Sequence, residues 1–162
     1  MSEMNDQYKR MIEDIYKNGE LRYPRGQEVR ELRPYVFTLS DPNDNVITVP
    51  GFQTNTEYSR EELRWYVEGT GDIDFSPKIQ KIWSKYSDDG KRVNSNYGER
   101  IFGRHPRIKL NQWEWAKELL QRDPDSRQAV LNINSAFDKD VPTKDFPCTL
   151  DLQFFKTQGS LE

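Results

Sequence analysis

The sequence predicts an α+β fold in which helices and strands are mixed. Apolar residues recur at helical spacing in several segments, and short β-prone runs bounded by turn residues lie between them. The chain has 162 residues, of which 12% are aromatic, and this argues against disorder and for a hydrophobic core. These observations favour one folded domain that combines both kinds of element.

Four segments are expected to be helical. The first runs through Met4 to Tyr16 and ends near Gly19, which suits a C-terminal cap. A capping box begins the second helix, Ser59 to Val67. Ser76 and the proline after it begin the third, and Asn111 caps the fourth. The apolar faces of the last two helices are expected to contain Ile79, Ile82, Trp83 and Tyr86 in one, and Trp113, Ala116, Leu119 and Leu120 in the other.

Strands are expected in two parts of the chain. The arginine-rich stretch Leu21 to Arg33 is interpreted as a loop. After it, Tyr35 to Leu39 and Val46 to Val49 form a predicted hairpin, because the residues between them are typical of turns. In the last third, Ala129 to Ile133 and Thr149 to Phe155 are expected to be strands joined by a long polar loop.

Composition excludes several kinds of function. The formal net charge of −3 gives no electrostatic footprint for duplex nucleic acid. No apolar run approaches the roughly 20 residues that span a membrane, so we expect a cytoplasmic protein without membrane partners. With one cysteine and one histidine, the chain forms no intrachain disulfide and no Cys/His zinc set.

Cys148 is the first candidate for chemistry. It follows a proline at the start of a predicted strand, where it is either a small buried apolar residue or a nucleophile whose thiolate is favoured by nearby cations. Arginines provide candidate phosphate contacts, because the guanidinium fork matches phosphate oxygens. Arg25 lies in the arginine-rich loop and Arg127 just before a predicted strand, and the alternative for both is a solvated basic surface.

Other candidate residues also have structural alternatives. Glu62 is a potential general acid or base, but it also fits the glutamate of the capping box. Trp83 and Tyr97 are candidate walls of a base-binding pocket, although a tryptophan at that position of a helix also suits core packing. His105, which precedes a proline, is assigned no role.

Taken in order, these segments resemble the thymidylate synthase and deoxynucleotide hydroxymethylase family, over about residues 5 to 156. Members carry an arginine loop after the first helix, followed by six motifs whose order and approximate spacing agree with this chain. The matching segments are Glu62-Leu63-Arg64-Trp65-Tyr66-Val67-Glu68-Gly69, Ile82-Trp83, Tyr97-Gly98, Asp123-Pro124-Asp125-Ser126-Arg127, Pro147-Cys148 and Gln153-Phe154.

Some details distinguish branches of the family. The run Asn94 to Gly98 and the pair Cys148-Thr149 resemble the phage-type hydroxymethylases, whereas Gly69 to Asp72 is nearer the synthase pattern. Gln128 stands where members have a second arginine of the phosphate grip. Members continue for roughly another hundred residues, so we expect residues 1–160 to be a single domain with a truncated thymidylate synthase-like fold, a mixed sheet flanked by helices, and Leu161-Glu162 to be a candidate cloning remnant.

The resemblance implies one-carbon transfer to carbon 5 of a deoxypyrimidine monophosphate, dUMP or dCMP, with 5,10-methylenetetrahydrofolate as cofactor and a homodimer as the assembly. It makes the chain a methyl- or hydroxymethyltransferase, and the alternative is a non-catalytic dimeric binding or assembly module that keeps the fold. The implied roles are nucleophile for Cys148, proton transfer for Glu62, phosphate binding for Arg25 and Arg127, with Arg127 reaching the partner's site, and shaping of the cavity for Trp83 and Tyr97.

Overall fold

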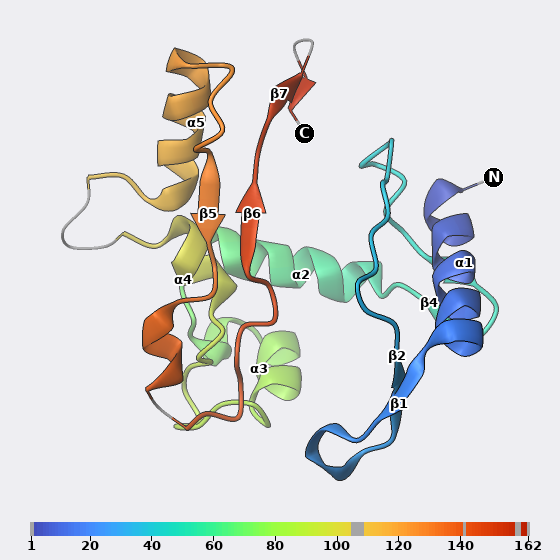
Figure 1. The fold of residues 1–162 in the computed structure, drawn as a ribbon. Helices are drawn as coiled ribbons and strands as arrows, with labels where there is room; N and C mark the ends of the chain where they lie inside the picture. Colours follow the sequence, from blue (N-terminus) through green and yellow to red (C-terminus); the bar gives the residue numbers. More distant parts are fainter. Residues whose placement is uncertain (1, 105–108, 141, 158–159, 162) are drawn as a thin grey trace. The chain divides into compact units, whose positions relative to one another are not determined.

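The fold was analysed in a computed structural model that describes residues 2–104, 109–140, 142–157 and 160–161, without the side chain of Phe137 (Figure 1). His105 therefore lies outside the described residues. The chain divides into two compact units, Met1–Thr56 and Glu57–Glu162. Whether residues 1–160 act as a single domain stays a prediction. Among the described residues, no helix combines the length and apolar character needed to cross a bilayer.

The first unit begins with the predicted helix, α1 (Glu3–Asn18). The side chain of Ser2 caps it by accepting a hydrogen bond from the backbone N–H of Asn5. Gly19 follows the helix as predicted. Its φ of −73° shows that it is not a left-handed cap, so glycine is needed here for another reason. A Cβ atom there would lie 2.5 Å from the carbonyl oxygen of Ile15, so the position needs glycine for close packing.

The arginine-rich stretch is a hairpin, so its interpretation as a loop was wrong. Strand β1 (Glu20–Arg22) pairs antiparallel with β2 (Val29–Glu31), across the short 3-10 helix η1 (Pro24–Gly26). All three residues of β1 are exposed. The hairpin therefore buries no apolar face, and the alternation that normally reveals a strand is missing from the sequence.

The second predicted hairpin is shifted along the chain. No strand is assigned at Tyr35 to Leu39, so that prediction was wrong. Instead β3 (Thr48–Val49) pairs antiparallel with β4 (Phe52–Gln53). The turn between these strands contains Gly51, whose φ of +86° favours glycine. The hairpin therefore turns at Gly51 and not at the polar run that was expected to connect the strands.

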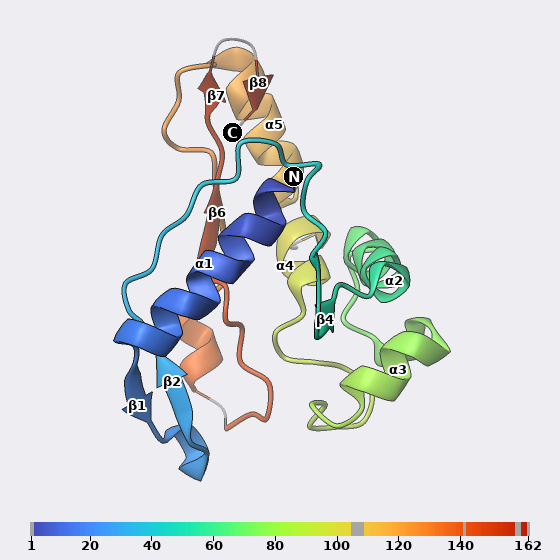
Figure 2. The same cartoon turned by 90° about the vertical axis from the view of Figure 1, so that its right-hand side faces the viewer.

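The second unit contains two adjacent helices, α2 and α3 (Figures 1 and 2). Helix α2 (Thr56–Val67) begins three residues before the predicted start, so the capping box at Ser59 was wrong. The earlier start extends the helix through Tyr58, whose ring packs against the core. Helix α3 (Pro77–Trp83) begins after Ser76 as predicted, with 3-10 helix η2 (Ile73–Phe75) before it.

The remaining elements complete this unit. Helix α5 (Gln112–Arg122) is capped by Asn111 as predicted, but α4 (Tyr97–Phe102) was not expected. The two strands predicted in the last third form an antiparallel pair, shorter than expected, and the loop between them contains a short 3-10 helix. The bounds are β5 (Val130–Asn132), η3 (Ala136–Lys139), β6 (Asp151–Gln153), β7 (Lys156–Thr157) and β8 (Ser160–Leu161).

Two apolar clusters hold the second unit together. One joins α2, η2 and α3 around Trp65 and Ile79, which are 1% and 0% exposed. The other packs α5 against β5, with Leu131 fully buried. The predicted apolar face of α3 is only partly buried, because Ile82 is exposed and Tyr86 lies beyond the end of the helix. The α+β class is confirmed, with the described strands arranged as antiparallel pairs.

Candidate active site

Cys148 presents an exposed thiol at the end of the loop that leads into β6. Its backbone N–H donates a hydrogen bond to the hydroxyl oxygen of Tyr97 over 3.1 Å, and its Sγ lies 3.8 Å from the carbonyl oxygen of Phe146. The residue before it, Pro147, is buried and anchors this end of the loop. The alternative of a buried, inert cysteine does not hold, since the sulfur is open to a reactant.

The loop before Cys148 is held by hydrogen bonds to two distant turns. The carboxylate of Asp145 accepts from the backbone N–H of Ser95 over 2.7 Å. Earlier in the loop, the hydroxyl of Thr143 donates to a carboxylate oxygen of Asp88 over 2.6 Å. This hydrogen bond and one from the Lys144 backbone lower the pKa of Asp88, so the anchoring carboxylate is ionised at neutral pH. The loop is therefore fixed at two points shortly before Cys148.

Tyr97 is the first residue of α4, and its place is set by its neighbours on either side. Asn96 has the left-handed φ of 34° and caps the helix by accepting from the backbone N–H of Glu99. Gly98 packs so closely that a Cβ would lie 2.7 Å from the carbonyl oxygen of Tyr66 on α2. As a result the rings of Tyr97 and Tyr66 meet, with centroids 5.7 Å apart.

Glu62 lies in the middle of α2, away from the helix start, so it is not a capping glutamate. The hydroxyl of Tyr58 donates to its Oε1 over 2.7 Å, and the same hydroxyl oxygen accepts from the indole N–H of Trp83 over 2.8 Å. Burial raises the pKa of Tyr58, and the hydrogen bond to Glu62 and its charge raise it further. Burial, followed by the charge of Glu62, raises the pKa of Tyr66 in the same way. Both phenols therefore stay protonated at neutral pH.

These contacts bring four predicted residues into one connected region of the second unit. The sequence of contacts runs from Cys148 through Tyr97 and its ring partner to Glu62, and from there to Trp83. Sequence reasoning missed Tyr58 and the ring partner of Tyr97, Tyr66. Both were detectable, because they lie one helical turn on either side of Glu62 once the helix start is placed correctly.

Of the two predicted phosphate-binding arginines, Arg127 belongs to the second unit and Arg25 to the first. Arg127 is exposed between α5 and β5, and its backbone carbonyl accepts from the side chain of Gln153 over 2.9 Å. Arg25 belongs to the first unit, where it lies in η1 with a left-handed φ of 52°. Both guanidinium groups are on exposed residues and are available to an anion.

A further buried group missed by the sequence stabilises the same region. Arg100 on α4 forms a two-pronged ion pair with Asp138, at 2.5 and 2.7 Å, and also donates to the carbonyl oxygens of Asn94 and Ile133. It thereby joins the segment before Tyr97 to the end of β5 and to η3. No motif indicated this pair, because two ordinary charged residues 38 positions apart carry no local signal.

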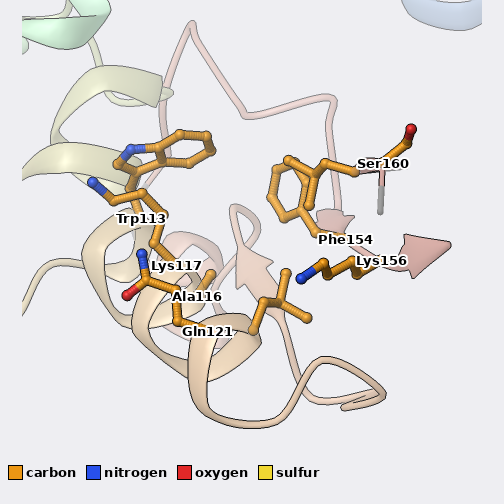
Figure 3. A pocket seen from close by; sticks show the side chains of 9 residues that line it. Trp113, Ala116, Lys117, Gln121, Phe154, Lys156 and Ser160 are labelled. Atoms are coloured by element: carbon orange, nitrogen blue, oxygen red, sulfur yellow. The ribbon is translucent and has the colours of Figure 1, made fainter. Parts of the chain in front are cut away.

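Two hollows are described in the second unit. One, of about 250 Å³, lies between α5 and the strands β7 and β8, with the rings of Trp113 and Phe154 in its wall (Figure 3). Another, of about 640 Å³, lies beside Trp115 and the outer side of β5. Neither of these two hollows is lined by Cys148 or Glu62.

The model of the thymidylate synthase family matches residues 6–162, and the chain belongs to that family. A deoxyuridylate hydroxymethyltransferase of Bacillus phage SP01 is 32% identical over 167 residues, which cover 96% of this chain and 43% of the relative. A deoxycytidylate 5-hydroxymethyltransferase of Enterobacteria phage T4 is 28% identical over 106 residues, 62% of this chain and 42% of the relative. The chain thus spans less than half the length of these curated relatives.

The solved structures show the same fold. The thermostable thymidylate synthase A of Bacillus subtilis matches with a TM-score of 0.72 and 17% identity, over 99% of this chain and 62% of that protein. At this identity the match speaks for the fold alone. The predicted thymidylate synthase-like fold and the resemblance to the family are both confirmed.

Proposed function

We propose that this chain takes part in one-carbon transfer to carbon 5 of a deoxypyrimidine monophosphate, dUMP or dCMP. One observation supports this above all: the exposed thiol of Cys148 is held by Tyr97 in a region that also contains Glu62 and Trp83. A nucleophile and a proton-transfer group are the parts that this chemistry needs. The family membership supplies the reaction class.

The reaction follows from the chemistry of the ring. Carbon 5 of a pyrimidine is a poor nucleophile, but addition of the Cys148 thiolate at carbon 6 moves electron density onto it as an enolate. Carbon 5 then attacks the one-carbon unit. Loss of the proton from carbon 5 would break the bond between the one-carbon unit and its donor nitrogen, which leaves with the electron pair. Water would then add to the one-carbon unit to give hydroxymethyl, or hydride from the cofactor to give methyl, and expulsion of the sulfur restores the ring and frees the thiolate. In this scheme Glu62 orders water and transfers protons beside the ring.

A folate fits the described residues in one respect. Trp83 and Tyr97 offer half-buried aromatic surfaces, the kind of surface that stacks with a flat heterocycle. When bound, 5,10-methylenetetrahydrofolate supplies a one-carbon unit at the level of formaldehyde. We assign Trp83 and Tyr97 to shaping the cavity around the ring and the cofactor, and Arg25 to the phosphate.

Arg127 has a separate proposed role. It is exposed, and in the family that this chain resembles the matching arginine reaches the site of the second subunit. We therefore propose a homodimer in which Arg127 of one protomer binds the phosphate held by the other. Two guanidinium groups, from Arg25 and Arg127, would match a phosphate dianion in charge.

The names of the relatives favour hydroxymethyl over methyl as the product. The phage relatives are named hydroxymethyltransferases, acting on deoxyuridylate in one case and deoxycytidylate in another. Both bases therefore stay open for this chain. A hydroxymethyl product requires water to reach the one-carbon unit, and we assign the ordering of that water to Glu62.

The test is a covalent adduct. The chain is incubated with the 5-fluoro derivative of dUMP or dCMP and 5,10-methylenetetrahydrofolate, and its intact mass is measured. Fluorine cannot leave carbon 5 as a proton does, so the adduct accumulates on the sulfur. Because the chain has one cysteine, Cys148→Ser removes every thiol and should abolish the mass shift, whereas exposed Thr157→Ala should keep it.

The alternative function gives a different result. A non-catalytic dimeric module would form dimers in analytical ultracentrifugation, yet give no mass shift with either fluorinated nucleotide and no heat on titration with dUMP or dCMP. That combination would contradict the proposed reaction for this chain.

A further inference from the structure

We propose that Trp83 and Tyr58 form a one-directional hydrogen-bond relay that orients the carboxylate of Glu62, and that both are positioning residues for its proton transfers. The inference rests on the proposed function for the role of Glu62. The relay itself rests on two hydrogen bonds, from the indole N–H of Trp83 to the Tyr58 hydroxyl oxygen and from that hydroxyl to Glu62 Oε1.

The direction of the relay follows from the donor inventory. An indole N–H can only donate, so at the 2.8 Å contact the Tyr58 oxygen must be the acceptor. A phenol has one proton, and the acceptor-only carboxylate of Glu62, 2.7 Å away, takes it. Each bond polarises the next, so the Tyr58 proton is aimed at Glu62 more firmly than by an isolated contact.

The relay joins two helices whose relative position is fixed by packing. Tyr58 and Glu62 are one turn apart on α2, so their side chains lie on the same face. Trp83 is the last residue of α3, and its ring contacts the buried ring of Trp65, with centroids 5.6 Å apart, and that of Tyr86 at 5.7 Å. Because Trp83 is held by this packing, it is a rigid reference for the carboxylate.

The hydrogen bond from Tyr58 fixes the orientation of the Glu62 carboxylate. An ionised carboxylate has two oxygens with about four acceptor positions. Tyr58 occupies a position on Oε1, which stops the group from rotating about its terminal torsion, a broad and soft one in glutamate. The carboxylate, which the Tyr66 side chain also hydrogen-bonds, is then held in a constant orientation, and this preorganisation is what proton transfer needs.

The experiment compares the wild-type chain with Tyr58→Phe, Trp83→Phe, Glu62→Gln and the double variant Tyr58→Phe/Glu62→Gln, in steady-state transfer to dUMP or dCMP. In Tyr58→Phe, phenylalanine keeps the ring packing and removes the hydroxyl. Tyr58→Phe should lower kcat by about 10- to 100-fold, the range for a lost hydrogen bond to a charged group. KM should change by less than about threefold, because the hydroxyl does not contact substrate. The double variant should be no slower than Glu62→Gln, because Tyr58 acts only through Glu62.

Tyr35→Phe is the matched control. Its hydroxyl also donates to a carboxylate, that of Asp14 over 3.1 Å, but in the first unit and at no candidate residue. Its kcat should equal that of the wild type. Equal kcat values for Tyr58→Phe and the wild type would overturn the inference, as would additive losses in the double variant, since additivity would mean that Tyr58 acts independently of Glu62.

A second measurement separates the relay from the proposed function. In ¹⁵N-labelled protein the indole N–H signal of Trp83, assigned by its loss in Trp83→Phe, should shift in Tyr58→Phe and also in Glu62→Gln, and stay in place in Tyr35→Phe. An unchanged signal in Tyr58→Phe or Glu62→Gln would refute the relay, whatever the activity. Shifts without any fluoronucleotide adduct in the wild type would support the relay while refuting the proposed function.

Discussion

Substituting Asp138 by alanine should destabilise the protein through one buried charge. In the native fold the guanidinium of Arg100 meets both carboxylate oxygens of Asp138, and the side chains are 17% and 8% exposed. The same carboxylate accepts from the backbone N–H of Ser135 over 2.7 Å. Alanine leaves the guanidinium inside the fold with only backbone carbonyls as partners, and it leaves the Ser135 N–H without its acceptor.

The magnitude follows from the cost of an uncompensated buried charge. Removing one partner of a buried ion pair costs about 3–5 kcal/mol. For a chain of this size each kcal/mol lowers Tm by about 2–4 °C, so Asp138→Ala should lower Tm by about 6–20 °C. Asp138→Asn should lose less, because the amide oxygen still accepts from Arg100 and from the Ser135 backbone.

Thermal unfolding followed by circular dichroism measures the effect. Asp140→Ala is the matched control, since Asp140 is exposed and lies two residues away, and it should change stability by no more than about 0.5 kcal/mol. If Asp138→Ala melts within the error of Asp140→Ala, the buried pair does not hold the fold and the reasoning is refuted.

The pH dependence gives an independent check of the same pair. The hydrogen bond from Arg100 lowers the pKa of Asp138. A hydrogen bond from the Ser135 backbone and the positive charges of Arg100 and Lys139 lower this pKa further. A carboxyl whose pKa is lower in the folded state contributes stability that is complete above its unfolded value of about 4 and is lost as pH falls through the folded value. The urea midpoints of the wild type and Asp138→Asn should therefore differ at pH 7 and converge in acid.

Three other perturbations test the site and its support. Gly98→Ala should cost about 1–3 kcal/mol in urea unfolding, because the added methyl would lie 2.7 Å from the Tyr66 carbonyl oxygen and push α4 from α2. Ser76→Ala should cost about 1 kcal/mol through the lost cap of α3, and a neutral result would refute the capping assignment. Mixing Arg127→Ala with Cys148→Ser should restore turnover that neither variant has alone if Arg127 serves the partner's site; no recovery would place it elsewhere.

Local sequence signals predicted the elements that have both a cap and a buried face. Helix α5 has Asn111 at its start and a stripe of apolar residues that packs on β5, so two independent signals agree. Helix α3 has Ser76 followed by proline at its start. Where only one signal was present, prediction was less accurate: the pattern at Ser59 suits a cap, but the packing of Tyr58 starts the helix earlier.

Elements without a buried apolar face were missed or displaced. The β1–β2 hairpin is exposed along β1. Because β1 has no buried side, its sequence lacks the alternation of apolar and polar residues that indicates a strand. Helix α4 is capped by Asn96 in a left-handed conformation, and the polar residues before the helix are typical of a turn. The helix forms because Gly98 lets it approach α2 and because Arg100 is neutralised by Asp138, and both causes are contacts between distant residues.

The placement of Cys148 shows the same division between motif and contact. The motif identifies the sulfur, but its exposure depends on backbone hydrogen bonds to Tyr97 and from Ser95 to Asp145. Such bonds use the main-chain N–H that every residue except proline has, so no side-chain pattern reports them. They nevertheless fix the thiol and Tyr97 in one region, and α4 continues that region to α2 and Glu62 through the contact of Tyr97 with Tyr66. Substitutions in the supporting turns should therefore alter the reactivity of the thiol as surely as changes next to it, because the geometry of the site is carried by residues that have no chemical role.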